Sequence, residues 1–258
     1  MSLVKLTGRL RAHDWTAAVI ELLIVVVGIL IALQVSNWNQ DRLERVRADS
    51  YYRRLHDNLV TDQHAMDAAL AFWKQVSTYG RGAMAFAETG ERVDGSSWKT
   101  VLAYYQASQI MPFELEDTSF LEMRDTGDLA LITNEALRNR LADYYRLTST
   151  GSIRANILRH DPEYRRQVRG LTPWAVQQYI WDKCFRQLVG TGQELIDCPA
   201  PISEAASAQL LESYRSADTL LPTLRYWVAT LRVSEIVLAE SRAKVVGLER
   251  DVEAARGR

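Results

Sequence analysis

Residues 22–33 of the chain read LLIVVVGILIAL and contain no polar side chain. Extended to residues 16–35, the apolar stretch is about 20 residues long and is interrupted only by Glu21 and Gln34. A helix of about 20 apolar residues, rising ~1.5 Å at each, crosses the hydrocarbon core of a bilayer. The stretch therefore predicts a helix whose surroundings are the lipid bilayer.

Tryptophans stand at both ends of this stretch. Trp15 and Trp38 are roughly 34 Å apart on a helix, and tryptophan prefers the two membrane interfaces. The sequence thus predicts a transmembrane helix over residues 15–38. A core helix of a soluble domain is the competing interpretation, but such a helix is rarely apolar on all sides. A cleaved signal peptide needs small residues at both −3 and −1, which residues 32–36 do not supply, so we predict an uncleaved signal anchor.

Glu21 is the charged residue inside the apolar stretch. A carboxylate costs a few kcal/mol at the bilayer centre and less toward an end, and the apolar run outweighs that cost. Helical spacing places Glu21, Gly28 and Ala32 near one stripe, and a Gly-x-x-x-Ala pair lets a second helix approach closely. One interpretation is a homo-oligomer in which Glu21 faces a partner helix. The other is that Glu21 extends to the nearby interface and Gly28 has no packing role.

The anchor also resembles a known family. Residues 21–39, ELLIVVVGILIALQVSNWN, are similar to the N-terminal anchor E-x-x-I-V-V-x-G-I-L-I-A-L-Q-x-x-N-W-N of a family of uncharacterised bacterial single-pass membrane proteins. Residues 118–145, TSFLEMRDTGDLALITNEALRNRLADYY, resemble that family's G-x-L-x-L-I-x-N-x-x-L motif and paired tyrosines. The resemblance implies a bacterial membrane location and no particular activity. It also implies that Gln34, Asn37 and Trp38 matter for more than hydrophobicity.

Charge counting gives one indication of the side of the membrane. The short basic tail, residues 1–14, carries three cations, and the opposite flank carries five arginines between residues 42 and 54. Applied literally, the positive-inside rule keeps the C-terminal side in the cytoplasm, but long domains translocate largely regardless of charge.

The cysteines give the opposite indication. Cys184 and Cys198 are the only two in the chain, and a disulfide closing a loop of about 15 residues is worth ~3 kcal/mol in the chain-entropy model. Such a bridge fits an oxidising periplasm; two unrelated buried thiols are the alternative. We expect the tail in the cytoplasm and the domain in the periplasm, with the anchor in the bacterial inner membrane.

The chain after the anchor predicts long helices, because glycine (13) and proline (6) are scarce. Residues 39–79 contain neither, and apolar residues recur there at steps of three and four, interrupted by Asp62. This pattern predicts an amphipathic stalk helix that continues the membrane helix. Residues 39–95 form the predicted stalk and loop, with glycines at 80, 82, 90 and 95 loosening the helix, which we expect to end near residue 90.

Residues 96–258 predict a helical bundle that packs on the stalk, so the fold class is all-α. Caps and breakers place the helices: Ser96 or Ser97, Asn134 and Ser203 are the expected N-caps, and Gly127 closes a helix. No long alternating strand pattern is present. The last helix has an apolar stripe and should lie antiparallel to the stalk. The predicted helices are 96–109, 118–127, 134–147, 152–168 with a division near Pro162, 173–188 with Pro173 at the first position, 203–216 and 219–255.

No pattern in the chain indicates catalysis. His56 and His64 are eight residues apart rather than at the i, i+4 spacing of a zinc pair, and Gly190-Thr-Gly192 lacks the rest of a nucleotide-binding loop. The acidic run 114–117 could bind a cation, but we favour solvated loop and helix-start charges as its explanation. We predict no catalytic, cofactor-binding or metal-binding residue. A net charge of −1 gives no attraction to nucleic acid.

Three functions fit these features. The first is a non-enzymatic, membrane-anchored scaffold or interaction protein that self-associates. The second is an envelope sensor, or a module that binds lipid or a small ligand. It is suggested by five tryptophans outside the anchor, which core packing would also explain, and by five arginines between residues 154 and 169, which a solvated face would explain. The third is a hydrolase whose site follows no familiar motif.

Overall fold

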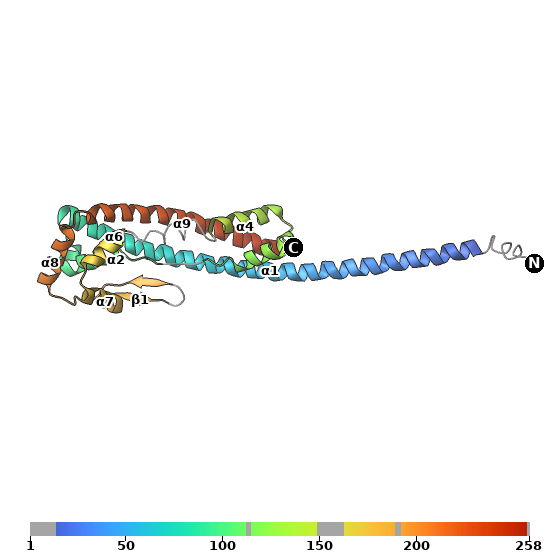
Figure 1. Ribbon diagram of the computed structural model, residues 1–258, viewed down its shortest axis with the longest axis horizontal. Coiled ribbons are helices and arrows are strands. Elements are labelled where there is room, and N and C mark those ends of the chain that lie inside the picture. The colour runs from blue at the N-terminus through green and yellow to red at the C-terminus, as the bar shows by residue number, and fades with distance from the viewer. Residues whose placement is uncertain (1–13, 112–114, 149–162, 189–191, 257–258) are drawn as a thin grey trace, which may run out of the picture. The chain divides into compact units, whose positions relative to one another are not determined.

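The computed structural model of the chain (Figure 1) describes residues 14–111, 115–148, 163–188 and 192–256. It divides into two compact units, Met1–Tyr51 and Tyr52–Arg258. The described elements are helices apart from one two-stranded sheet, which confirms the predicted all-α class. The tail that we predicted over residues 1–14 lies outside the described residues except for Asp14.

The first helix, α1 (Asp14–Thr89), is 76 residues long and carries the apolar stretch directly into the predicted stalk. It ends before Gly90, whose φ of +78° is the left-handed conformation usual after a helix. The expectation that Gly80 and Gly82 loosen the helix is wrong, because α1 runs through both. A Cβ at Gly80 would lie only 2.6 Å from Val228 Cγ2, and one at Gly82 only 2.9 Å from Val93 Cγ2. These glycines therefore allow neighbouring elements to approach α1 closely.

The last helix, α9 (Leu220–Arg256), lies beside the C-terminal part of α1 and runs antiparallel to it, as predicted (Figure 1). Polar contacts between the two helices run in opposite order along them and set their register. Of these contacts the two arginine–carboxylate pairs are exposed, so each of those contributes little free energy. They are Glu88 with Arg225, Ser77 with Glu235, Asp67 with Arg242, and His56 with Glu249.

The apolar stripes predicted on these two helices form the centre of the core. On α1 the residues of the stripe are at most 1% exposed, apart from Tyr52 at 8%. On α9 nearly all members are buried, and only Val228 is half-buried. Burial of each large apolar side chain contributes about 1.5–3 kcal/mol to folding. The buried members are Leu55, Leu59, Met66, Ala69, Trp73 and Val76 of α1, and Leu224, Leu231, Leu238, Val245, Leu248 and Val252 of α9.

Shorter helices complete the helical unit, and caps predicted from the sequence begin or end several of them. Ser96 accepts a hydrogen bond from Lys99 N, Ser203 does so from Ala206 N, and Gly127 closes a helix with a φ of +79°. The elements are η1 (Val93–Gly95), α2 (Ser97–Gln106), α3 (Thr118–Thr126), η2 (Asp128–Leu131), α4 (Glu135–Thr148), α6 (Glu163–Leu171), α7 (Trp174–Lys183) and α8 (Glu204–Arg215).

The predicted helix 173–188 is wrong at both ends. Pro173 is the N-cap of α7 rather than its first helical residue. The helix stops at Lys183 because the chain turns into an antiparallel hairpin of β1 (Phe185–Gln187) and β2 (Gln193–Leu195), in which Phe185 pairs with Leu195. Strands of three residues are too short to show an alternating pattern. The first part of the predicted helix 152–168 lies outside the described residues, and α6 begins after Pro162.

The close approach at Gly80 gives a test of the α1–α9 packing. Gly80→Ala should lower the free energy of unfolding by about 1–3 kcal/mol, because the added methyl group overlaps Val228 and overpacks the interface. The second substitution Val228→Ala should restore most of the loss. Urea unfolding followed by circular dichroism measures the effect.

Gly170→Ala is the matched control for this test, since its Cβ meets nothing within 4 Å in α6. It should be neutral or stabilising by up to ~1 kcal/mol through helix propensity. A Gly80→Ala protein as stable as the Gly170→Ala protein would contradict the close packing.

Candidate functional site

The apolar part of α1 is long and apolar enough to cross a membrane. Every residue from Ala18 to Val35 is exposed in the single chain. A helix in the core of a soluble domain buries at least one face, so this exposure argues against that interpretation. Trp15 and Trp38 are 76% and 61% exposed, as interface anchors would be.

The stripe of Glu21, Gly28 and Ala32 is open along this helix. All three residues are exposed, and a Cβ at Gly28 would meet nothing within 4 Å. The helix therefore has room for a second helix at this stripe, while a single chain leaves the self-association itself a prediction.

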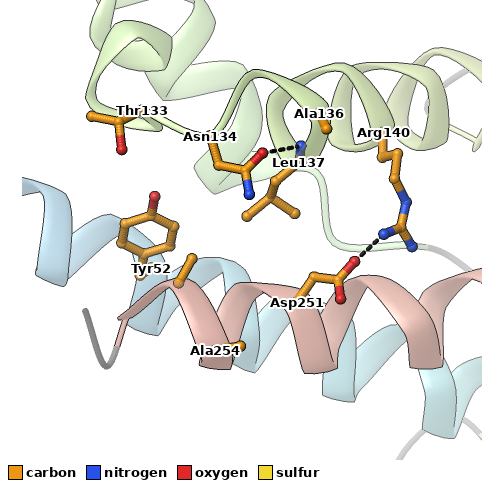
Figure 2. Close-up of a pocket in the computed structure, with 9 residues that line it drawn as sticks. Tyr52, Thr133, Asn134, Ala136, Leu137, Arg140, Asp251 and Ala254 are labelled. Carbon is orange, nitrogen blue, oxygen red and sulfur yellow. Dashed lines mark hydrogen bonds and ion pairs between the residues drawn. The ribbon is translucent and has the colours of Figure 1, made fainter.

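A pocket of about 390 Å³ lies within the helical unit at the start of α4 (Figure 2). The beginning of α4 and the last turns of α9 form two of its walls, and Tyr52 of α1 forms a third. In Figure 2 the Tyr52 hydroxyl points toward Thr133 and the side-chain amide of Asn134. Residues far apart in the sequence thus share one hollow, which is why sequence patterns did not reveal it.

Two interactions fix the walls of this pocket. Asn134 Oδ1 accepts a hydrogen bond from Leu137 N at 3.1 Å, which caps α4 as predicted. Arg140 of α4 forms an ion pair with Asp251 of α9. The small side chains of Ala136, Ala254 and Ala255 leave the space between the helices open.

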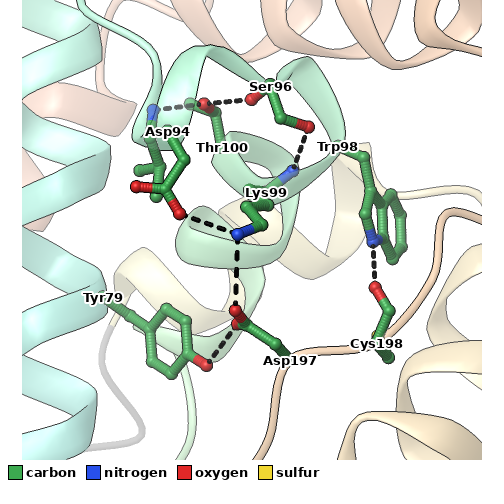
Figure 3. A network of polar contacts seen from close by, with 9 residues as sticks. Tyr79, Asp94, Ser96, Trp98, Lys99, Thr100, Asp197 and Cys198 are labelled. Atoms are coloured by element: carbon green, nitrogen blue, oxygen red, sulfur yellow. Dashed lines mark hydrogen bonds and ion pairs between the residues drawn. The ribbon is translucent and has the colours of Figure 1, made fainter.

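Cys184 and Cys198 form a disulfide with a Cα–Cα distance of 5.2 Å, and it encloses the β1–β2 hairpin. Helix α2 holds both cysteine backbones. Gln106 Nε2 donates to the carbonyl of Cys184 at 2.8 Å. Trp98 Nε1 donates to the carbonyl of Cys198 at 2.9 Å, as Figure 3 shows. The bridge is therefore part of the packed unit.

A polar network beside the disulfide ties this segment to α1 and α2 (Figure 3). Asp197 accepts a hydrogen bond from the Tyr79 hydroxyl at 3.3 Å and lies 3.7 Å from Lys99 Nζ, which also pairs with Asp94 at 2.7 Å. Burial, together with Asp197, raises the pKa of Tyr79 to about 12. Tyr79 therefore remains a hydrogen-bond donor to Asp197 at neutral pH, and the network joins the segment after the hairpin to α1 and α2.

Asp62 is a fully buried carboxyl group on the apolar stripe of α1. It accepts a hydrogen bond from Glu116 N at 2.7 Å and one from the Tyr144 hydroxyl at 2.6 Å. Burial raises its pKa from 3.8 to about 6, although the two hydrogen bonds lower it in part. Asp62 thus links α1 to α4 and to the segment before α3. Glu116, in the acidic run 114–117, supplies the backbone N–H of this contact. Glu114 lies outside the described residues.

The described arginines of the basic segment are engaged within the protein. Arg165 donates to the carbonyl of Ser108 at 2.7 Å, and Arg169 donates to Gln109 Oε1 at 2.9 Å. The Arg169 guanidinium also lies 5.0 Å from the Tyr105 ring centroid. These contacts bind α6 to the end of α2, so they do not support a lipid-facing role for α6. Arg154 and Arg159 lie outside the described residues.

The structure also places the candidate metal ligands and the tryptophans outside the anchor. Among the residues that the structure describes, no group of three His, Cys, Asp or Glu side chains could hold a metal ion. His56 contacts Glu249 at 3.2 Å. Trp73, Trp98 and Trp227 are buried, which confirms core packing for these three, whereas Trp174 and Trp181 are exposed.

Comparisons with protein-family models, curated proteins and solved structures found no match to this chain. The resemblance of the anchor to a bacterial family therefore stays a prediction from the residues that carry it.

The raised pKa of Asp62 predicts a pH-dependent stability. Between pH 3.8 and about 6 the unfolded carboxyl is ionised while the folded one holds its proton, so stability falls as pH rises through this window and is constant above it. Asp62→Asn removes the buried charge and should gain roughly 1–3 kcal/mol over wild type at pH 7.5 but little at pH 4. Urea unfolding at the two pH values measures this difference.

Asp62→Leu is the control that separates charge from hydrogen bonding. It leaves Glu116 N and the Tyr144 hydroxyl without their acceptor, so it should destabilise the protein at both pH values. If wild type and Asp62→Asn differ equally at pH 4 and pH 7.5, Asp62 does not titrate in this window.

Proposed function

We propose that this chain is a single-pass protein of the bacterial inner membrane whose helical unit is a scaffold or interaction module in the periplasm. The observation that carries the proposal is the exposure of the apolar side chains around the whole helix from Ala18 to Val35. Apolar surface gains roughly 25 cal/mol per Å² when it leaves water. A lipid bilayer covers such a surface on every side, which a folded domain of one chain does not.

The disulfide supports the periplasmic side. Disulfides persist in oxidising compartments and are rare in the cytosol. Because α2 holds the backbone at both Cys184 and Cys198, the bridge adds to a packed structure. This favours the domain outside the cytoplasm over the location that the arginine count gives.

A role as an interaction module is supported by how the polar groups of the helical unit are used. Asp62, Lys99 and Arg169 bind neighbouring elements and hold the helices together. The open stripe of Gly28 and Ala32 supports a second copy of the chain as one partner.

The first experiment tests membrane anchoring and the orientation of the chain together. A reporter that is active only in the periplasm, and separately one that fluoresces only in the cytoplasm, is fused after Arg258. We expect the chain in the membrane fraction after carbonate extraction, with an active periplasmic reporter. In denaturant, which exposes the buried Cys184, both Cys184 and Cys198 should react with a maleimide only after reduction. An active cytoplasmic reporter, or thiols that react without reduction, would overturn the orientation.

A pair of variants makes this test specific to the apolar stretch. Val26→Arg with Val27→Arg should release the chain from the membrane, since each arginine costs about 2.5–3.5 kcal/mol at a helix centre. Val46→Arg is the matched control, because Val46 is 62% exposed and follows the stretch; it should leave the chain bound. Wild-type chain in the soluble fraction would overturn the membrane tether itself.

Self-association has its own test in a transmembrane reporter assay. Gly28→Leu should abolish the signal because leucine fills the space through which a second helix approaches, whereas Gly28→Ala keeps a small residue and should retain most of it. A signal unchanged by Gly28→Leu would favour the other interpretation, in which Glu21 extends to the interface and Gly28 has no packing role.

A further inference from the structure

The pocket at the start of α4 is lined by a tyrosine whose hydroxyl opens into it. Tyr52 as a whole is only 8% exposed, and no other group in the described part of the chain bonds its hydroxyl. The ring is held among the core residues of α1, so the hydroxyl faces the hollow (Figure 2). Burial raises the pKa of Tyr52 above its usual value, which keeps the hydroxyl protonated and able to donate.

Two more side-chain donors face the same hollow. Asn134 uses Oδ1 to cap α4, which leaves its side-chain NH₂ free to donate toward the pocket. Serine, threonine or aspartate would cap a helix as well as asparagine, but none of them adds an amide donor. Thr133 contributes a hydroxyl from the preceding position.

The N-terminus of α4 adds backbone donors. The first N–H groups of a helix have no partner within it, and in this 14-residue helix Asn134 Oδ1 binds only that of Leu137. The N–H groups of Glu135 and Ala136 are therefore available beside the pocket. A helix N-terminus also carries partial positive charge, which favours an anion.

The charged pair at the rim does not oppose an anion. Asp251 is neutralised by Arg140, which holds it in an ion pair across the gap between α4 and α9. The groups that can donate to a ligand here are the Tyr52 and Thr133 hydroxyls, the Asn134 side-chain amide and the first N–H groups of α4, with Thr133 and Asn134 on the exposed side of the pocket. The complementary ligand is a strong hydrogen-bond acceptor with negative charge.

We propose that this pocket binds the oxyanion of a small molecule, either a carboxylate or a phosphate, with Tyr52, Thr133 and Asn134 as its side-chain donors. A volume of about 390 Å³ suits a small ligand and excludes a polymer chain. The proposal goes beyond the tether, and it holds whichever side of the membrane the helical unit occupies.

Thermal unfolding of the full chain in detergent tests the site with three probes: sodium phosphate, sodium acetate, and sodium chloride at matched ionic strength. A ligand at tenfold excess over its Kd should raise Tm by about 3–5 °C for a unit of this size. A rise with phosphate alone identifies a phosphoryl ligand, and a rise with acetate alone identifies a carboxylate. Either result supports the site.

Variants show whether the rise comes from this pocket. Tyr52→Phe removes one hydroxyl, and Asn134→Asp keeps the helix cap but replaces the amide donor with a negative charge. Both should keep a Tm near that of wild type in chloride and lose the rise in phosphate or acetate. Tyr226→Phe is the matched control, because Tyr226 is 70% exposed on α9 and does not line the pocket; it should keep the rise.

Two results would overturn the proposal. One is a wild-type Tm in phosphate and acetate equal to that in chloride. The other is an equal rise in wild type, Tyr52→Phe and Asn134→Asp, since general salt exclusion from the protein surface raises Tm without a site.

Discussion

The antiparallel packing of α9 on the C-terminal part of α1 is the interaction on which the rest of the helical unit depends. The stripes of the two helices bury leucine, valine and aromatic side chains against each other. The fit depends on Gly80, where a side chain would overlap Val228. The shorter helices add to this pair. Helix α2 is bound to α9 through the Trp227 indole, which donates to the carbonyl of Ala107 at 2.7 Å.

Buried polar groups determine where the shorter elements lie, which the apolar packing of α9 on α1 leaves undetermined. Apolar packing is non-directional, whereas a buried carboxyl has to meet donors in specific directions. Asp62 meets Tyr144 and Glu116, and so it fixes the C-terminal part of α4 against α1. The first half of α4 contacts α9 through the exposed ion pair of Arg140 with Asp251. The pocket follows from these two constraints, because they hold the start of α4 near α9 while small alanines leave the space unfilled.

The sequence could predict those parts of the structure that depend on neighbours along the chain. Helical spacing gave the stripes of α1 and α9, and caps such as Ser96 and Asn134 gave the starts of helices. Asp62 lies three residues after Leu59 and four before Met66, so its register placed it on the stripe. A buried position could have been inferred from that spacing, but its partners could not. The hairpin and the pocket depend on contacts between distant segments, which local periodicity does not contain.

The proposed side of the membrane rests on two features that bear on different stages of the life of the protein. In a membrane-anchored chain the arginines between residues 42 and 54 would bear on insertion, when a flanking charge resists crossing, and that effect weakens as the following domain grows longer. The disulfide acts after folding, since its survival depends on the redox potential of the compartment. A bridge closing a loop of about 15 residues contributes ~3 kcal/mol, a large share of the net stability of an ordinary domain. A unit that relies on this bridge is more stable in an oxidising compartment, and for this reason we give the cysteines more weight than the arginines.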